Sequence, residues 1–427
     1  FVPGNVIGAI PTHDHSGSIV AVQVKIAKEK IKKKAIKSND KPVDVVASSL
    51  RGVLSPVAAN LPKILPLTRA VRRARNNNPN GEKIVNPSTR AELVCKDEWK
   101  YTHNGDLFLI HDSGGDKKRF IVFTTQKSLN FLTTCEQWLG DGTFRTAPAI
   151  FTQIYVIHGL KNGKTLPLVY LLAPNKTKVT YVNFLKVLRD RIPNYRPQRL
   201  MVDFEKAFLE AFKEVYSGVQ VNGCNFHFTK CVWKHVQKYG HQKKYNEDIK
   251  FSMNIRLLMA LAFVPSEDVI AAFEEIVSSE YYDQNSDCFE ELLEYFELTW
   301  IGKVKHNKNK RDKPLFPIKM WNCQTAVIHD YLRSNNPCEG WNSGFNKRAG
   351  QAHPVMEELV KSLKDEQVKT DVLMTQIESG LDVSNTRLKA YRNYTERLKN
   401  FVLNYDVNKK YEYLNNVAKI LASKMLF

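Results

Sequence analysis

Short apolar runs, several with alternating polar positions, occur in five segments between residues 136 and 227, and they predict β-strands. In chain order the five segments read EQWLGDGTF, FTQIYVIHG, LPLVYLLAP, QRLMVDF and VQVNGCNFH. Apolar residues at helical spacing follow the third, fourth and fifth segments, in VTYVNFLKVLRDRI, EKAFLEAFKEV and FTKCVWKHVQKYG. The predicted order is therefore β-β-β-α-β-α-β-α.

This order predicts an α/β protein whose mixed sheet is covered by helices. Two hairpin connections come first, and two strand-helix-strand crossovers follow. The order is that of the ribonuclease H-like fold, and its first part is expected to span residues 81–240. Two further strand-prone stretches, DLFLIHD and RFIVFTT, lie at the beginning of that range.

Helical periodicity replaces the strand pattern from residue 241 onward. Residues 241–330 predict a helical insertion that interrupts the core. A core helix is expected within 331–370, with Asn336 as its N-cap and Pro337 at its first position. Residues 371–427 are polar and helical, and they are expected to form a tail that packs on the body or on a partner.

Residues 16–80 predict a basic module of three short helices. The arrangement suggests a helix-turn-helix whose last helix enters a DNA groove, although a charged linker would have the same pattern. A basic loop at residues 305–313 is a second candidate for contacts with phosphate. The candidate DNA-binding residues are Lys32, Lys33, Lys34, Arg69, Arg72, Arg73, Arg75, Lys308, Lys310 and Arg311.

The net charge of the chain indicates which class of partner it binds. The 427 residues include 63 Lys and Arg against 44 Asp and Glu, a formal charge of +19. Such an excess favours polyanions such as nucleic acid, although a solvated basic surface is the alternative. The apolar stretches are too short to span a bilayer, and the seven scattered cysteines indicate a reducing compartment.

Two aspartates stand at matching places in the predicted sheet. Asp141 ends the first core strand and Asp203 ends the fourth, and these strands are expected to be neighbours. Two buried acids repel unless a cation is present, and Mg²⁺ prefers such oxygen ligands. Glu339 is the expected third acid; Glu205 competes but is expected to point elsewhere from its helix. The alternative is that each Asp only caps a helix or forms a turn.

The chain resembles the transposase domain of Mutator-like elements (MULE) over roughly residues 100–365. The resemblance is carried by LGDGTFRTAPAIFTQIYVIHG, LPLVYLLAPNKTKVTYVNFL, MVDFEKAF, CNFHFTKCVWKHV and NNPCEGWNSGFNKR. It implies a DDE-type enzyme in which Asp141, Asp203 and Glu339 bind two Mg²⁺ or Mn²⁺ ions. A Cys-x-x-His motif of the family is matched by Cys224 and His227.

The resemblance also implies a function. Such an enzyme cuts DNA at the ends of an element and joins those ends to target DNA, as a homodimer or larger assembly in the nucleus. The alternative is a host-domesticated, catalytically silent DNA-binding regulator. For Cys224 and His227, zinc binding, a role near the active site and a purely structural role remain open.

The first residues resemble the end of a FLYWCH-type zinc finger. His13 and His15 would be its last two ligands, so residues 1–15 are expected to be a remnant of that finger. The chain begins at Phe1 and is expected to be a fragment. Zn²⁺ is expected only in the full-length protein.

Overall fold

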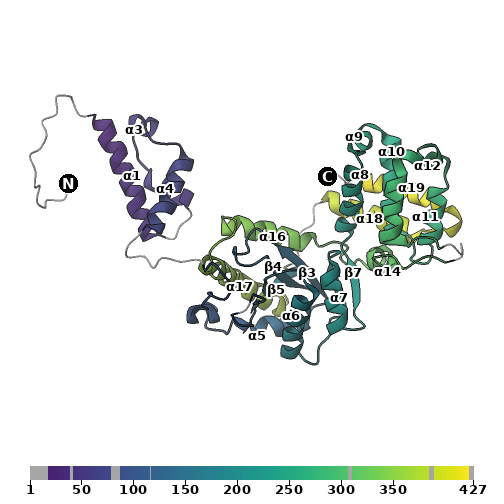
Figure 1. Ribbon diagram of the computed structural model, residues 1–427, viewed down its shortest axis with the longest axis horizontal. Coiled ribbons are helices and arrows are strands. Elements are labelled where there is room, and N and C mark those ends of the chain that lie inside the picture. The colour runs from purple at the N-terminus through teal and green to yellow at the C-terminus, as the bar shows by residue number, and fades with distance from the viewer. Residues whose placement is uncertain are drawn as a thin grey trace, which may run out of the picture. The chain divides into compact units, whose positions relative to one another are not determined.

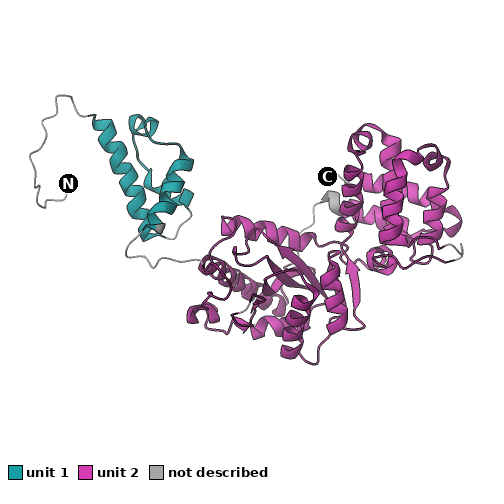
Figure 2. Ribbon diagram, in the orientation of Figure 1, with its two compact units in different colours: residues 1–86 teal, residues 87–427 magenta. Residues whose placement is uncertain are grey.

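The chain forms two compact units, residues 1–86 and residues 87–427 (Figure 2). The computed structural model describes residues 18–38, 42–77, 87–115, 117–305, 310–383 and 389–422. Within these residues, no helix combines the length and the apolar character needed to cross a membrane.

The first unit is a small bundle with a basic surface. Its helices are α1 (Ile19–Lys37), α2 (Pro42–Ser49), α3 (Ser55–Ala59) and α4 (Ile64–Asn76). The four residues that define the apolar face of α1, namely Val24, Ala27, Ile31 and Ala35, are all buried. The predicted helical module is therefore present, with α3 as an additional short helix.

A seven-stranded mixed sheet organises the second unit (Figure 1). Its strands are β1 (Leu109–Asp112), β2 (Ile121–Phe123), β3 (Gln137–Thr143), β4 (Gln153–Lys161), β5 (Lys164–Ala173), β6 (Arg199–Val202) and β7 (Gln220–Gly223). The spatial order is β1-β2-β5-β4-β3-β6-β7. Strand β3 pairs antiparallel with β4 and parallel with β6, so the predicted neighbours at the centre of the sheet are confirmed.

Alternation along the strands gives the sheet two differently covered faces. On one face, Trp138, Leu200 and Val202 belong to a core that includes residues of α5 (Gln126–Thr133), α6 (Lys178–Arg191) and α7 (Lys206–Val215). On the other face lie α16 (Asn336–Ala349) and α17 (Met356–Glu378), which contact β3 and β5. Figure 1 shows α16 above the strands and α5 and α6 below them.

The helices expected as an insertion at residues 241–330 form a lobe with an aromatic core. Its helices are α8 (Asn225–Lys238), α9 (Gln242–Glu247), α10 (Ile249–Ala260), α11 (Val269–Val277), α12 (Glu280–Gln284), α13 (Ser286–Phe296), α14 (Ile318–Trp321) and α15 (Gln324–Ile328). The lobe thus also includes α8, which was expected to belong to the sheet core within residues 81–240 but packs on α10 and α13. Phe228 stacks on Trp321 and meets Trp300 edge-on, with ring centroids 4.9 Å apart in both pairs. Short 3₁₀ segments lie at Asp97–Lys100, Leu261–Phe263 and Val407–Lys409, and Glu297–Ile301 is π-helical.

The C-terminal segment belongs to the same lobe. Helices α18 (Lys389–Leu403) and α19 (Lys410–Ala422) pack against α15 and α10, and the Tyr413 hydroxyl donates to the carbonyl of Phe263 at 2.7 Å. The polar tail predicted for residues 371–427 is thus divided between two parts of the fold. Residues 371–378 complete α17, and α18 and α19 close the helical lobe.

A buried carboxylate joins α16 to α17. Glu366 on α17 is only 7% exposed. It accepts hydrogen bonds from the indole N–H of Trp341 at 2.8 Å and from Nη2 of Arg348 at 2.7 Å, both on α16. Lys369 adds an ion pair at 3.3 Å. These contacts hold α16 in its place over the sheet.

Replacing Glu366 with Ala is expected to lower the free energy of unfolding by about 3 kcal/mol, because hydrogen bonds to a charged group are worth about 1.5–3 kcal/mol and the indole N–H loses its acceptor. Urea denaturation of the full chain measures the change. Glu358→Ala is the matched control, since its carboxylate is exposed and accepts one hydrogen bond from Gln351. An equal effect of both substitutions would contradict this role of Glu366.

Candidate active site

The register of β3 against β6 brings Asp141 and Asp203 together. Leu139 pairs with Met201 in the parallel ladder, and each aspartate lies two residues further along its own chain. Since residues i and i+2 share one face of a strand, both carboxylates continue the face of Leu139 and Met201. Both aspartates line the same pockets at this end of the sheet.

A buried asparagine positions the helix that carries Glu339. Asn335 has no exposed surface, and its Nδ2 donates to the carbonyl of Gly140, next to Asp141, at 2.8 Å. Its backbone N–H donates to Sγ of Cys224 at 3.1 Å, and its carbonyl accepts from the N–H of Glu339 at 3.0 Å. Asn335, not the predicted Asn336, is thus the N-cap of α16, because tertiary contacts fix that residue outside the helix.

The three predicted acids line one open groove of about 690 Å³. Asp141 and Asp203 come from the sheet, and Glu339 comes from the first turn of α16. The groove is lined by Asp141, Gly142, Thr143, Phe144, Arg145, Asp203, His227, Glu339, Asn342, Ser343, Asn346, Lys347 and Gly350. Helical spacing explains the contribution of α16, since residues three, four and seven positions after Glu339 share its face.

Asp141 is buried among like charges. Burial, together with the Asp203 and Glu339 carboxylates, raises the pKa of Asp141 to about 7, although the N–H of Gly142 opposes the shift. Nδ2 of Asn342 donates to Oδ2 of Asp141 at 2.7 Å. The sequence prediction missed Asn342 and Asn335. For Asn342, the signal in the sequence was its position three residues after Glu339, which places both side chains on one face of the helix.

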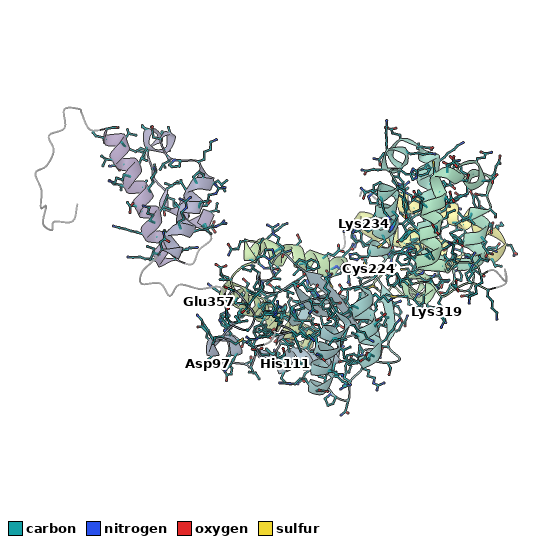
Figure 3. The ribbon with its side chains drawn as sticks, viewed as in Figure 1. Asp97, His111, Cys224, Lys234, Lys319 and Glu357 are labelled. Atoms are coloured by element: carbon teal, nitrogen blue, oxygen red, sulfur yellow. The ribbon has the colours of Figure 1, made fainter. Side chains whose placement is uncertain are left out.

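His227 lies between two of the acids. Its Nδ1 is 2.9 Å from Oδ1 of Asp203, and its Nε2 is 3.4 Å from Oε1 of Glu339. Burial lowers the pKa of His227, but the Asp203 carboxylate and the Cys224 side chain outweigh it and raise that pKa to about 10. The imidazolium therefore pairs with both acids at neutral pH. Figure 3 labels Cys224 where β7 leads into α8, and Lys234 further along that helix.

The side chains have the chemistry of a magnesium site, but not its arrangement. Carboxylate oxygens and the buried Oδ1 of Asn342, which has no hydrogen-bond partner among the described residues, are hard ligands of the kind Mg²⁺ prefers. In the described part of the chain, however, no three His, Cys, Asp or Glu side chains are placed to hold a metal ion. Asp203 and Glu339 are instead paired with His227, one through each ring nitrogen.

Glu205 lies closer to this site than predicted. It lines a smaller pocket together with Asp141 and Asp203, so the expectation that it points elsewhere is wrong. Oε1 of Glu205 accepts from the Tyr181 hydroxyl at 2.6 Å, and Oε2 pairs with Lys176 at 2.9 Å. Glu205 is the N-cap residue of α7 and keeps an extended backbone, so it has not yet entered the helix and stays beside the end of β6.

The predicted DNA-binding residues fall into three groups. Seven are exposed or partly exposed: Lys32, Lys33, Lys34, Arg69, Arg72, Arg73 and Lys310. Of these, Lys32 pairs with Glu29 at 2.8 Å. Arg75 donates to the carbonyls of Ala35 and Ser38, and Arg311 pairs with Glu297 and Glu274, so these two guanidinium groups form contacts within the fold. Lys308, His13 and His15 lie outside the described residues.

Comparison with known proteins gives one family for the segment that contains the two aspartates. No curated protein matches the chain. One family model matches the segment from the start of β3 into α8, which includes Asp141, Asp203, Cys224 and His227, while Glu339 lies beyond it. Residues 137–231 of this chain match the family model of the MULE transposase domain.

Proposed function

We propose that this chain is a DNA transposase of the Mutator-like class, which cuts DNA at element ends and joins them to target DNA. The observation that carries the proposal is the meeting of Asp141, Asp203 and Glu339 in one groove, from three separate segments of the chain. The order β5-β4-β3-β6-β7, with three antiparallel strands followed by two parallel additions, supports a ribonuclease H-like core.

Asp141, Asp203 and Glu339 would hold two Mg²⁺ or Mn²⁺ ions. Bound ions would activate the attacking oxygen and stabilise the leaving oxygen in phosphoryl transfer. The protein's own part is to hold the acids in place: Asn342 orients the Asp141 carboxylate, and Asn335 fixes α16 against β3. His227 balances the charge of Asp203 and Glu339 through its two ring nitrogens.

The basic first unit supports DNA as the partner. Lys32 and Lys33 on α1, and Arg69, Arg72 and Arg73 on α4, are exposed. Such cations displace the counterions of DNA, which makes binding depend steeply on salt. A nuclear location and a homodimer or larger assembly that pairs two DNA ends belong to the same proposal.

A second candidate is a catalytically silent DNA-binding regulator with the same fold. The specific observation in its favour is His227, which pairs with Asp203 and Glu339 where a metal ion would otherwise bind. Calorimetric titration of the EDTA-treated chain with Mn²⁺ separates the two candidates. Binding accompanied by nicking supports the enzyme, whereas DNA binding with neither Mn²⁺ binding nor nicking supports the regulator.

Asp203→Asn is expected to reduce Mg²⁺- or Mn²⁺-dependent nicking of labelled duplex DNA carrying element ends by more than about a hundredfold. Loss of even an outer partner of a metal ligand commonly costs about 10- to 100-fold. DNA binding, measured by fluorescence anisotropy, should stay within about twofold, because the cations of the first unit are unchanged.

Asp190→Asn is the matched control for this substitution, since Asp190 is exposed near the end of α6, where its partner is Arg189. It should nick like the native chain. Equal nicking by the native chain and Asp203→Asn would show that the carboxylate of Asp203 takes no part in the reaction.

Asp141→Asn is expected to stabilise the metal-free chain at pH 8. The folded state raises the pKa of Asp141 from 3.8 to about 7, so between these pH values it keeps a proton that the unfolded chain releases. Stability is therefore lost as pH rises through this window, by about 4 kcal/mol at most at 1.36 kcal/mol per pH unit. Asparagine does not ionise and removes this loss.

Urea denaturation in EDTA at pH 8 and pH 4 measures the effect. At pH 8 the free energy of unfolding of the variant should exceed that of the native chain. The difference should shrink towards pH 4, where Asp141 is protonated in the folded state. The Asp190→Asn control should show no such dependence. A difference that is constant across the pH range would contradict the buried, repelled carboxylate described for Asp141.

A further inference from the structure

Besides the three carboxylates, the groove is lined by basic, amide and aromatic side chains. Phe144 and Arg145 directly follow β3, and Asn346 and Lys347 lie in the last turns of α16. We name these four residues the basic end of the groove. None of them was singled out by the sequence patterns, since they come from two segments that only the fold brings together.

Phe144 presents an aromatic ring to solvent beside the acids. It is 47% exposed, and it lines both the groove and the smaller pocket next to Asp141 and Asp203. Nζ of Lys176 lies 4.4 Å from its ring centroid. Most large apolar side chains this close to the sheet are buried, so an exposed ring here offers a stacking surface.

The polar members of the basic end have groups available for a ligand. Arg145 and Lys347 are exposed, and within the described ranges no acidic side chain pairs with either. Their neighbour Arg348, in contrast, is paired with Glu366. Oδ1 of Asn346 accepts from the hydroxyls of Thr143 at 3.3 Å and Thr146 at 3.0 Å, which turns its amide N–H₂ group away from them.

We propose that the basic end binds an unpaired stretch of DNA next to the bond that is cut. Arg145 and Lys347 contact its phosphates, and Phe144 stacks on one of its bases. A base inside an intact duplex has its faces covered by its neighbours, so this ring selects a strand that has left the duplex. The inference rests on the proposed function for the identity of the polymer.

The test uses the full chain in EDTA, where no cutting takes place, and two labelled oligomers of equal length. One is a thymidylate oligomer, and the other has the same phosphates but abasic sugars. The native chain should bind the thymidylate oligomer about tenfold more tightly, the gain expected of one stacked base. The cations of the first unit contact phosphates in either oligomer, so this ratio reports the stacking ring.

Phe144→Ala should abolish the preference, and Phe144→Trp should retain it. Phe401→Ala is the matched control, because Phe401 is also exposed but lies on α18, and it should leave the preference intact. A preference that survives Phe144→Ala, or is lost equally in Phe401→Ala, overturns the stacking role. Absence of any preference in the native chain overturns it as well.

The double variant Arg145→Gln/Lys347→Gln should bind both oligomers more weakly than the native chain does, by the same factor. It should also reduce the slope of log K against log salt by about 1.4, since each phosphate contact on a single strand contributes about 0.7. Arg196→Gln/Lys361→Gln removes the same charge from exposed positions elsewhere and should leave the slope unchanged. An unchanged slope in the Arg145/Lys347 variant overturns the phosphate contacts.

Failure of this inference and failure of the proposed function give different results. If the oligomer preference depends on Phe144 but the chain never nicks DNA with Mg²⁺ or Mn²⁺, the basic end stands as a strand-binding site and the transposase proposal fails. If the chain nicks DNA but shows no preference for bases, the transposase proposal stands and the inference fails.

Discussion

The parallel pairing of β3 with β6 is the constraint on which the candidate site depends. Side chains alternate between the faces of a strand, so a slip of one residue would place Asp141 and Asp203 on opposite faces of the sheet. Leu139 and Met201 lie on the same face as the acids and pack in one apolar cluster with Cys224 and Cys338, which stabilises this register. Apolar packing next to the acids therefore keeps both on one face of the sheet, and the amide of Asn342 orients the Asp141 carboxylate.

The third acid reaches this site through a long closure of the chain. Asn335 and Gly140, which are joined by a hydrogen bond, are 195 residues apart. Helices α8 to α15 of the lobe lie between them in sequence. The N–H of Asn225 donates to the carbonyl of Arg333 at 2.8 Å, so this part of the lobe begins and ends close to the sheet. The aromatic core of the lobe is built around Phe228 and Trp300, and Phe204, which follows β6, packs on Trp300 and joins this core to that of the sheet. An insertion of this kind can be long without displacing Glu339.

Local pattern was sufficient to predict the elements and two of the acids. The strand order, the crossover helices and the neighbouring ends of β3 and β6 follow from periodicity and chain order, which are properties of short segments. Asn335 could not be predicted as the N-cap, because its neighbour Asn336 has the same intrinsic preference and only contact with Gly140 and Cys224 distinguishes them. Tertiary contact likewise decided the orientation of Glu205.

Tertiary contacts also decide which charged side chains remain available to a ligand. Arg75 and Arg311 belong to basic runs in the sequence, yet their guanidinium groups are used inside the fold, on helix carbonyls in one case and on two glutamates in the other. A run of cations predicts an electrostatic surface, but it does not identify which members are available for phosphate. Arg145 and Lys347 show the converse, since neither stands in a strongly basic run and both line the groove.

Charge balance at this end of the sheet distinguishes Glu205 from the three predicted acids. Glu205 is already neutralised by Lys176 and held by the Tyr181 hydroxyl. Asp203 and Glu339 both pair with the His227 imidazolium, and the pKa of Asp141 is raised first by its burial and then by the neighbouring Asp203 and Glu339 carboxylates. Buried acids repel one another unless cations accompany them. Under the proposed function, a divalent cation supplies the missing charge to these three acids and has no comparable attraction to Glu205.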